Sequence, residues 1–160
     1  MNQEPIDVPI QSLYSESARR CYGCGTAAKA GHQLQSFWDG EQARAEHTVD
    51  ANYMGVEGFV YGGMLASLID CHATATAAAA SGFIETEPTR VLPRYVTGTL
   101  EVKFVAPTPL GSEPLVLEAE VVQEKGRKSN VEVELRADGN VCVVGKVVAI
   151  QIPDTMKSSG

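Results

Sequence analysis

The stretch from Gly62 to Ala80 constrains the fold of this 160-residue chain more than any other part of its sequence. After two glycines it continues without a further glycine or a proline and with many alanines, the composition of an α-helix. Asp70 is the one carboxylate in this otherwise neutral segment, which makes it the first candidate for a functional residue. Larger side chains recur at helical spacing and predict a buried face: Met64, Leu65, Leu68, Ile69, His72 and Thr76.

Strand-like runs lie on both sides of this helix in the sequence. Residues 32–38 and 42–49 predict two strands joined at Asp39-Gly40, a dipeptide that favours a hairpin turn. Three later runs alternate apolar and polar residues, and a fourth is almost wholly apolar, as in a strand covered on both faces. These four runs are 100–104, 115–121, 131–135 and 141–150.

A single long helix is most economically buried inside an antiparallel sheet. We therefore predict an α+β fold in which about five to six strands wrap round one central helix. Residues 10–20 carry apolar side chains at helical spacing and predict a short N-terminal helix.

One domain accounts for a chain of this length, which we divide into an N-terminal segment with the short helix (1–20), the main domain (21–152) and a polar tail (153–160). The formal net charge of −7 argues against nucleic-acid binding, and no segment is long and apolar enough for a membrane partner. The N-terminus lacks the regions of a signal peptide, and the 4 cysteines do not resemble a disulfide framework. We expect a cytoplasmic protein.

The start of the helix suits acyl chemistry. Backbone N–H groups at a helix N-terminus are unpaired and can hold a developing oxyanion, and Gly62 and Gly63 let a carbonyl approach them closely. Asp70 then acts as a general base or as a nucleophile. Gly63 and Asp70 are separated by about 10 Å of helix rise, too far for one carbonyl carbon to touch both. Two antiparallel copies of the helix across a two-fold axis would bring them together, so we expect a site shared in a dimer.

Two further polar residues of the helix have alternative interpretations. Ser67 lies one turn before Asp70 and either bonds the carboxylate or is a small residue where two helices cross. His72 points away from Asp70, on the apolar face, and is either structural or reaches a ligand pocket or the partner subunit.

Cys21 and Cys24 form a CxxC motif in a glycine-containing turn. A zinc ion would need two more ligands, for which His32 and His47 are candidates, but the sequence has no second CxxC and no HxxxH motif. We therefore expect a structural turn with two packed thiols and no metal. His47 shares a strand face with apolar residues, which favours a core position.

Four short motifs, in order, resemble a known family. Gly58, Gly62, Gly63 and Asp70 are in register with G-x-x-H-G-G-x-x-x-x-x-x-D, the helix motif of hotdog-fold thioesterases of the phenylacetate-pathway (PaaI) type. Residues 21–25 resemble the C-[FY]-G-C-G element of a bacterial subgroup, residues 97–110 a central strand with a proline-containing exit, and residues 126–128 a hairpin turn. The resemblance to a PaaI-like acyl-CoA thioesterase covers 21–152.

This resemblance implies a hotdog fold and hydrolysis of an acyl-CoA thioester by a homodimer or a dimer of dimers, with CoA as part of the substrate and no other cofactor. It assigns the oxyanion site to the amides of Gly63 and Gly62 and the acid to Asp70, with Thr97 placing the water or holding the acid. Tyr61 stands where the family has a histidine, and it either orients the thioester through its hydroxyl or simply packs.

The phosphates of CoA require cationic side chains at the mouth of a site. Lys125, Arg127 and Lys128 form the densest positive spot in this acidic chain and are the first candidates. Arg90 and Arg94 are the second, in a long loop predicted over 81–95. The alternatives are an ordinary charged hairpin and a solvated loop.

Two other functions stay open. Tyr61 makes a non-catalytic acyl-CoA-binding hotdog protein credible. A hotdog dehydratase or hydratase would need a histidine that converges with an acid on the substrate, and His72 keeps that interpretation open. Release of free thiol from an acyl-CoA would separate the thioesterase from both.

Overall fold

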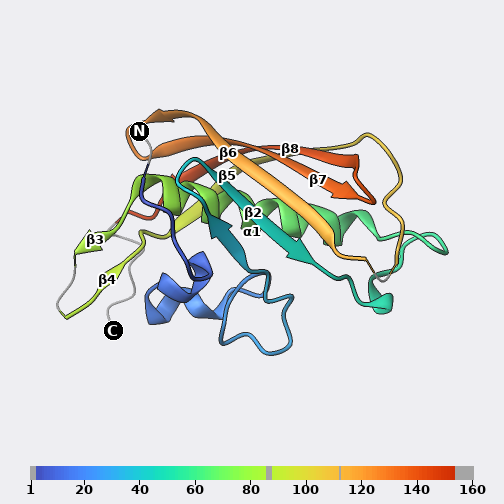
Figure 1. Cartoon of the computed structure of the whole chain (residues 1–160), viewed down its shortest axis with the longest axis horizontal. Coiled ribbons are helices and arrows are strands. Elements are labelled where there is room, and N and C mark those ends of the chain that lie inside the picture. The colour runs from blue at the N-terminus through green and yellow to red at the C-terminus, as the bar shows by residue number, and fades with distance from the viewer. Residues whose placement is uncertain (1–2, 86–87, 112, 154–160) are drawn as a thin grey trace.

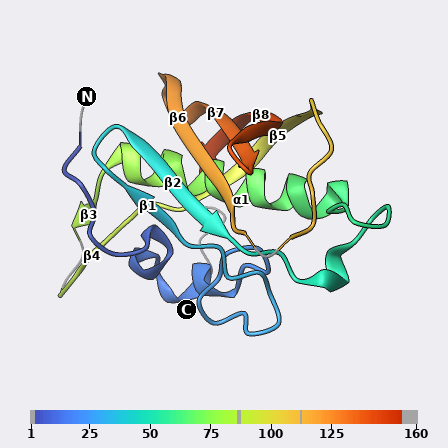
Figure 2. The same ribbon diagram turned by 45° about the vertical axis from the view of Figure 1, so that its right-hand side comes forward.

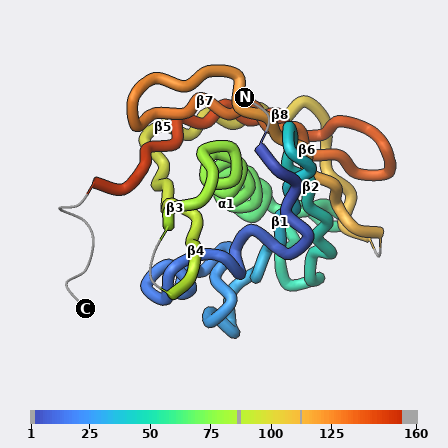
Figure 3. The backbone as a smooth tube through the Cα atoms, turned by 60° about the vertical axis from the view of Figure 1, so that its left-hand side comes forward, coloured from blue at the N-terminus to red at the C-terminus, as the bar shows by residue number. Residues whose placement is uncertain are grey.

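Helix α1 (Gly62–Ser81) forms the centre of the computed structural model, which describes residues 3–85, 88–111 and 113–153. A sheet curves over one side of the helix, and the N-terminal segment covers part of the opposite side (Figures 1 and 3). From Cys71 to Ala79 every residue of the helix is buried. The predicted central helix is confirmed, and its burial on all sides explains why its sequence is apolar and small rather than strongly two-faced.

The sheet has six strands in the order β1-β2-β6-β7-β8-β5, and all neighbours are antiparallel. This arrangement confirms the predicted α+β hotdog architecture. The strands are β1 (Ser36–Trp38), β2 (Gln42–His47), β5 (Tyr95–Phe104), β6 (Leu115–Lys125), β7 (Lys128–Ala137) and β8 (Asn140–Gln151).

Strand β5 lies at one edge of the sheet, where it pairs with β8 alone among the described strands (Figure 3). Its ten residues are mostly exposed, including Leu100 and Phe104. The register shifts between Thr97 and Thr99, so an irregularity interrupts the ladder with β8 at that point. An edge strand of this length presents a row of unpaired backbone groups and is a template for pairing with a further strand.

The helix approaches β8 very closely at Gly145. A Cβ atom built at this glycine would lie 2.3 Å from Cγ2 of Ile69, a helix side chain that is completely buried. After His72 the buried side chains of the helix are all small, namely Thr74, Thr76 and the alanines Ala73, Ala75, Ala77, Ala78 and Ala79. Small residues on one side and a glycine on the other let the helix lie against the sheet with little space between them.

The N-terminal segment is part of the core. Ile10 and Tyr14 are 0 % and 1 % exposed, and Ile6 forms a bridge with Trp38 at the end of β1. In Figure 2 the N-terminal segment, in blue, passes below β1. The single helix predicted over 10–20 is replaced by two 3₁₀ helices, Ile10–Leu13 and Glu16–Arg20. Tyr14 adopts an extended conformation between them, which interrupts the helical path and turns its ring into the core.

The long loop predicted over 81–95 contains a small two-stranded sheet. Strands β3 (Ile84–Glu85) and β4 (Arg90–Val91) pair antiparallel, and residues 86–87 between them are not described. Of the tail predicted over 153–160, residues 154–160 also lie outside the described part of the chain. Within the described residues, no helix has both the length and the apolar character needed to span a membrane.

Candidate functional site

The first two backbone N–H groups of α1 are unpaired in the described structure. Its N-cap residue, Tyr61, makes no side-chain capping hydrogen bond. The carbonyl of Tyr61 accepts bonds from the N–H groups of Met64 and Leu65, at 3.2 and 3.4 Å. Among the described residues no hydrogen bond uses the N–H of Gly62 or Gly63. These two amides are the unpaired donors that a helix N-terminus leaves over.

Two aromatic rings cover the glycines at this helix end. The ring of Tyr61 folds back over Gly63, where an added Cβ would lie 2.4 Å from its Cε2 atom. The ring of Phe104, from the end of edge strand β5, lies beside Gly62, where an added Cβ would be 3.2 Å from Cζ. At both positions an added Cβ would meet the far end of an exposed aromatic side chain, which would have to move aside.

Asp70 lies where α1 passes under the edge strand. Its Oδ1 atom accepts a hydrogen bond from the hydroxyl of Thr97 on β5, and Thr97 is exposed. Asp70 itself is half-buried. The two residues are far apart in the chain and meet because β5 returns across the helix, so the structure brings this predicted pair together at the open edge of the sheet.

The predicted bond from Ser67 to Asp70 does not form in this structure. The Ser67 hydroxyl donates instead to the carbonyl of Met64, at 2.8 Å, one turn earlier in the same helix. Backbone acceptors on the preceding turn are the usual partners of a helical serine. Asp70 thus relies on Thr97 for its side-chain contact.

His72 is completely buried and lies away from the helix N-terminus. Its Nδ1 atom is 2.9 Å from the hydroxyl of Ser36, and its Nε2 atom is 3.2 Å from the carbonyl of Ala43. Burial lowers the pKa of His72 to about 4, so the ring is neutral at physiological pH and donates to that carbonyl. Both ring nitrogens have hydrogen-bond partners within the core. Of the two interpretations given above, this favours a structural role for His72.

The end of the helix that carries Tyr61 is surrounded by exposed apolar side chains. They come from the loop before the helix and from the end of β5, and they are Met54, Val56, Phe59, Tyr61, Phe104 and Val105. Large apolar side chains gathered at the surface are typical of an interaction site.

The three predicted basic residues are grouped at the β6–β7 hairpin. Lys125 pairs with Lys128 in the register, Arg127 lies in the turn between them, and all three are exposed. Lys128 is opposite Ile150 of β8, which is in turn opposite Val96 of β5. Two strand spacings, about 10 Å, therefore separate this hairpin from the start of the strand that carries Thr97.

The two arginines of the 81–95 region have different surroundings. Arg90 is exposed, and its guanidinium lies 4.4 Å from the centre of the Phe83 ring. Arg94 is half-buried, with its guanidinium 5.0 Å from the centre of the Tyr14 ring. Burial acts to lower the pKa of Arg94, but Tyr14 and nearby cysteines outweigh it and raise the pKa. Arg94 thus lies on the inner side of the N-terminal segment.

A cluster of three thiols is present that the sequence does not predict. Cys71, which follows Asp70 on the helix, joins Cys21 and Cys24, and the three Sγ atoms lie within 4.8 Å of one another. His32 and His47, the zinc ligands considered from the sequence, are not part of it; their rings contact each other with centroids 6.3 Å apart. The CxxC motif marked two members, but nothing in the sequence indicated that the third lies on the helix.

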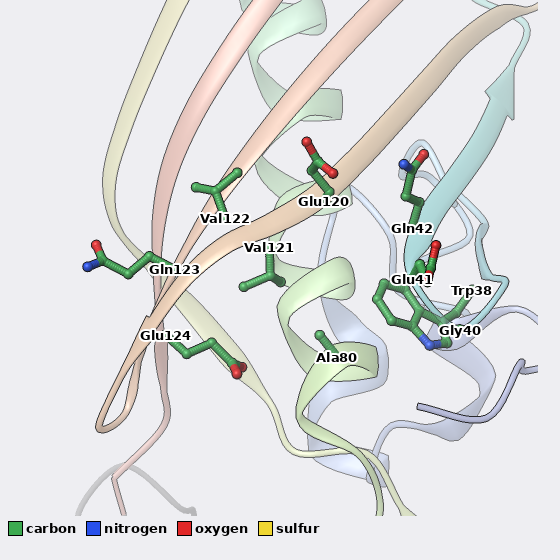
Figure 4. Close-up of a pocket in the computed structure, with 10 residues that line it drawn as sticks. All are labelled: Trp38, Gly40, Glu41, Gln42, Ala80, Glu120, Val121, Val122, Gln123 and Glu124. Atoms are coloured by element: carbon green, nitrogen blue, oxygen red, sulfur yellow. The ribbon is translucent and has the colours of Figure 1, made fainter. Parts of the chain in front are cut away.

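A hollow at the far end of α1 from Tyr61 borders the β6–β7 hairpin through Gln123 and Glu124. It is a groove of about 380 Å³ between the C-terminal end of α1, at Ala80, and the ends of β1 and β6 (Figure 4). Glu41, Glu120 and Glu124 are among its lining residues, and no lysine or arginine is. A groove with this charge is unsuited to phosphate groups.

Comparison with known proteins identifies a family for this chain. The family model described as Thioesterase superfamily matches residues 57–144, which include the helix N-terminus, Asp70 and Thr97. No curated protein matches the chain at a significant level.

Among solved structures, a thioesterase superfamily protein from Shewanella loihica PV-4 is 38% identical; the match covers 89% of this chain and 99% of that one, with a TM-score of 0.65. The PaaI protein of the E. coli phenylacetic acid degradation operon is 16% identical over 76% of this chain and 81% of its own, with a TM-score of 0.63, which shows the shared fold. A thioesterase from Haemophilus influenzae is likewise similar in fold, at 14% identity, 81% and 85% coverage and a TM-score of 0.65. From the family match and the Shewanella relative, this chain belongs to the thioesterase superfamily.

Proposed function

We propose that the protein hydrolyses an acyl-CoA thioester to a free acid and CoA. The observation that carries this proposal is the arrangement along α1: unpaired amides at Gly62 and Gly63, and farther along the same helix the carboxylate of Asp70 held by Thr97 at the edge of the sheet. A donor pair for a developing oxyanion and a carboxylate base are the two groups that hydrolysis of a thioester needs.

In this proposal Asp70 takes a proton from a water molecule whose oxygen attacks the thioester carbonyl carbon. The carbonyl oxygen becomes an oxyanion and is held by the N–H of Gly63, with Gly62 beside it, an interaction worth roughly 3 kcal/mol in comparable sites. The C–S bond then breaks, the oxyanion returns to a carbonyl, and the CoA sulfur takes the proton from Asp70. Direct attack by Asp70 on the carbonyl carbon is the other route, through an anhydride that water would then hydrolyse.

The two halves of the site come from different subunits in this proposal. Gly63 and Asp70 are about 10 Å apart along one helix, so a single copy does not hold both around one carbonyl carbon. The open edge of β5 and the apolar side chains beside it, including Phe104, support pairing of two copies along this edge. A two-fold axis there would set the Asp70 of one copy against the Gly63 of the other, in a homodimer or within a dimer of dimers.

We assign the CoA phosphates to the β6–β7 hairpin. Lys125, Arg127 and Lys128 are exposed, and among the described residues none of them forms an ion pair. The register places them about 10 Å from the start of β5, at the end of the sheet where Thr97 lies. The acidic groove at Ala80, whose lining reaches Glu124 next to this hairpin, does not itself offer phosphates such partners.

The test is the release of free thiol from a panel of acyl-CoAs, from aromatic to long-chain, by the native chain and by Asp70→Asn. The Asn side chain keeps the size of Asp70 but cannot accept a proton, so kcat is expected to fall by about 100-fold or more. Asp138→Asn, in the exposed β7–β8 turn, is the matched control and should keep full activity. Cleavage that survives unchanged in Asp70→Asn would overturn the proposed mechanism.

One observation favours a second function, a non-catalytic acyl-CoA-binding protein. The ring of Tyr61 lies against Gly63, the residue whose amide is proposed to hold the oxyanion. If the chain binds acyl-CoA in calorimetric titration and releases no thiol, this function replaces the first. In that case, the appearance of cleavage in Tyr61→His, which carries the residue of the resembled motif, would identify the ring as the block.

A further inference from the structure

Three cysteines from two distant parts of the chain meet beneath the N-terminal segment. Cys21 and Cys24 lie in the turn after the second 3₁₀ helix, and Cys71 comes from the buried face of α1. Their Sγ atoms all lie within 4.8 Å of one another, and those of Cys21 and Cys71 are 3.9 Å apart. The fourth cysteine, Cys142 on β8, is not part of this group.

The turn is shaped to bring the sulfurs together. An added Cβ at Gly23 would lie 2.3 Å from Sγ of Cys71, and one at Gly25 would lie 2.3 Å from the carbonyl of Arg19. Gly23 therefore lets the chain pass this close to the third thiol, and Gly25 lets the turn close against the backbone of Arg19 and Cys21.

Two buried hydrogen-bonding groups beside the thiols have no partner among the described residues. They are Nη1 of Arg94 and the hydroxyl of Tyr14. Arg94 interacts electrostatically with all three cysteines and Tyr14 with two of them, so both groups lie next to the cluster. Arg94 is half-buried, but its Nη1 atom is buried, and a buried donor without an acceptor favours a negative group nearby. Neutral thiols do not supply one.

A bound metal ion would account for the spacing of the sulfur atoms and for the positive charge of Arg94 beside them. Zinc binds cysteine sulfur at about 2.3 Å in tetrahedral geometry, which places two ligand sulfurs about 3.8 Å apart. The Cys21–Cys71 separation of 3.9 Å has this value. Three thiolates with one divalent cation carry a net charge of −1, which the guanidinium of Arg94 balances.

We propose that Cys21, Cys24 and Cys71 form a binding site for a thiophilic metal ion, Zn²⁺ or Cu⁺, which ties the N-terminal segment to the central helix. Thiolates select these soft ions over Mg²⁺ or Ca²⁺. Because Cys71 directly follows Asp70, the ion also fixes the rotation of the helix at the residue that Thr97 contacts. Three sulfurs leave a fourth position for a small exogenous ligand on zinc.

The first measurement is the metal content of the untagged full-length protein, followed by titration of the metal-free form with Zn²⁺ and, under anaerobic conditions, with Cu⁺. We expect one ion per chain with a Kd below about 1 μM for at least one of the two. Titration with Co²⁺ should produce a sulfur-to-metal charge-transfer band and the strong visible bands of a tetrahedral site.

Cys24→Ser should weaken binding by at least about 100-fold and reduce the charge-transfer band, because serine is a poor ligand for these ions and only two sulfurs remain. Cys142→Ser removes a buried thiol outside the cluster and should leave both unchanged. If Cys24→Ser does not fold, the native chain alone tests the metal site. Adding the metal must then raise the unfolding midpoint of the native chain, and a chelator must reverse that rise. Absence of stoichiometric binding of both ions, equal binding by Cys24→Ser, or a disulfide among the three thiols in the anaerobically purified protein would overturn the proposal.

Discussion

The close packing of α1 on β8 gives a stability prediction whose size follows from the structure. In Gly145→Ala the new methyl group would lie 2.3 Å from Cγ2 of Ile69, far inside van der Waals contact. Gly145 is opposite Val133 on one side and Val102 on the other, so the strand is held by two neighbours and cannot move away easily. Overpacking of this kind costs about 1–3 kcal/mol of unfolding free energy.

The contact can be isolated with a second substitution. Ile69→Ala removes Cγ2 and leaves only Cβ, which lies 3.6 Å from the added methyl group, an ordinary contact. Alone, Ile69→Ala should cost about 2–5 kcal/mol because it leaves a cavity in a fully buried position. In the variant that carries both substitutions, the added methyl group partly fills that cavity. The double variant should therefore lose less than the sum of the single losses, by at least about 1 kcal/mol.

The assay is urea denaturation followed by circular dichroism, at one protein concentration because an oligomer's stability depends on it. Gly111→Ala is the matched control, since an added Cβ there has nothing within 4 Å, and its unfolding free energy should stay within about 0.5 kcal/mol of the native value. A Gly145→Ala chain as stable as this control, or strict additivity in the double variant, would refute the reasoning.

Two more predictions concern single side chains of α1 and β5. Thr97→Val removes the hydroxyl that bonds Asp70, so it should lower kcat by about 10- to 100-fold with KM little changed. Thr97→Ser keeps the hydroxyl and should keep most of the activity. Equal rates for the two variants would contradict the role of the hydroxyl. The pKa of His72 is about 4 in the folded chain and near 6.5 in the unfolded chain. Between pH 6.5 and 4, therefore, only the unfolded chain takes up this proton. The unfolding free energy should fall by about 3 kcal/mol as the pH is lowered through this range. Urea midpoints measured across this range should change less in His72→Gln, and an identical pH dependence would rule out the assignment.

Most of the architecture could be predicted because it rests on local pattern. The glycine pair followed by an apolar, alanine-rich run indicated the central helix, and the alternation of apolar and polar residues indicated the strands after it. The meeting of Asp70 and Thr97 was implied by the family motif, not by their spacing, because the two residues belong to different elements.

The features that could not be predicted all depend on tertiary contacts. No local signal places Cys71 against the CxxC turn, since that contact joins a helix face to a segment 50 residues earlier. The prediction of a single helix over 10–20 was wrong for the same reason. Burial of the Tyr14 side chain in the core outweighs the helical spacing of its neighbours. Likewise, the ring of Tyr61 over Gly63 is a choice of side-chain direction that sequence spacing does not encode.

The pairing of edge strand β5 with β8 also has a consequence for how the chain is completed during synthesis. β5 ends at Phe104, and its partner β8 begins only at Asn140. At a translation rate of about 5–20 residues per second, roughly 2–7 seconds pass before the partner begins to be made. During that interval Thr97 has no ladder to hold it over Asp70. The nascent chain therefore carries an unpaired strand that is free to pair wrongly, and the last long strand to leave the ribosome is the one that sets this threonine in place.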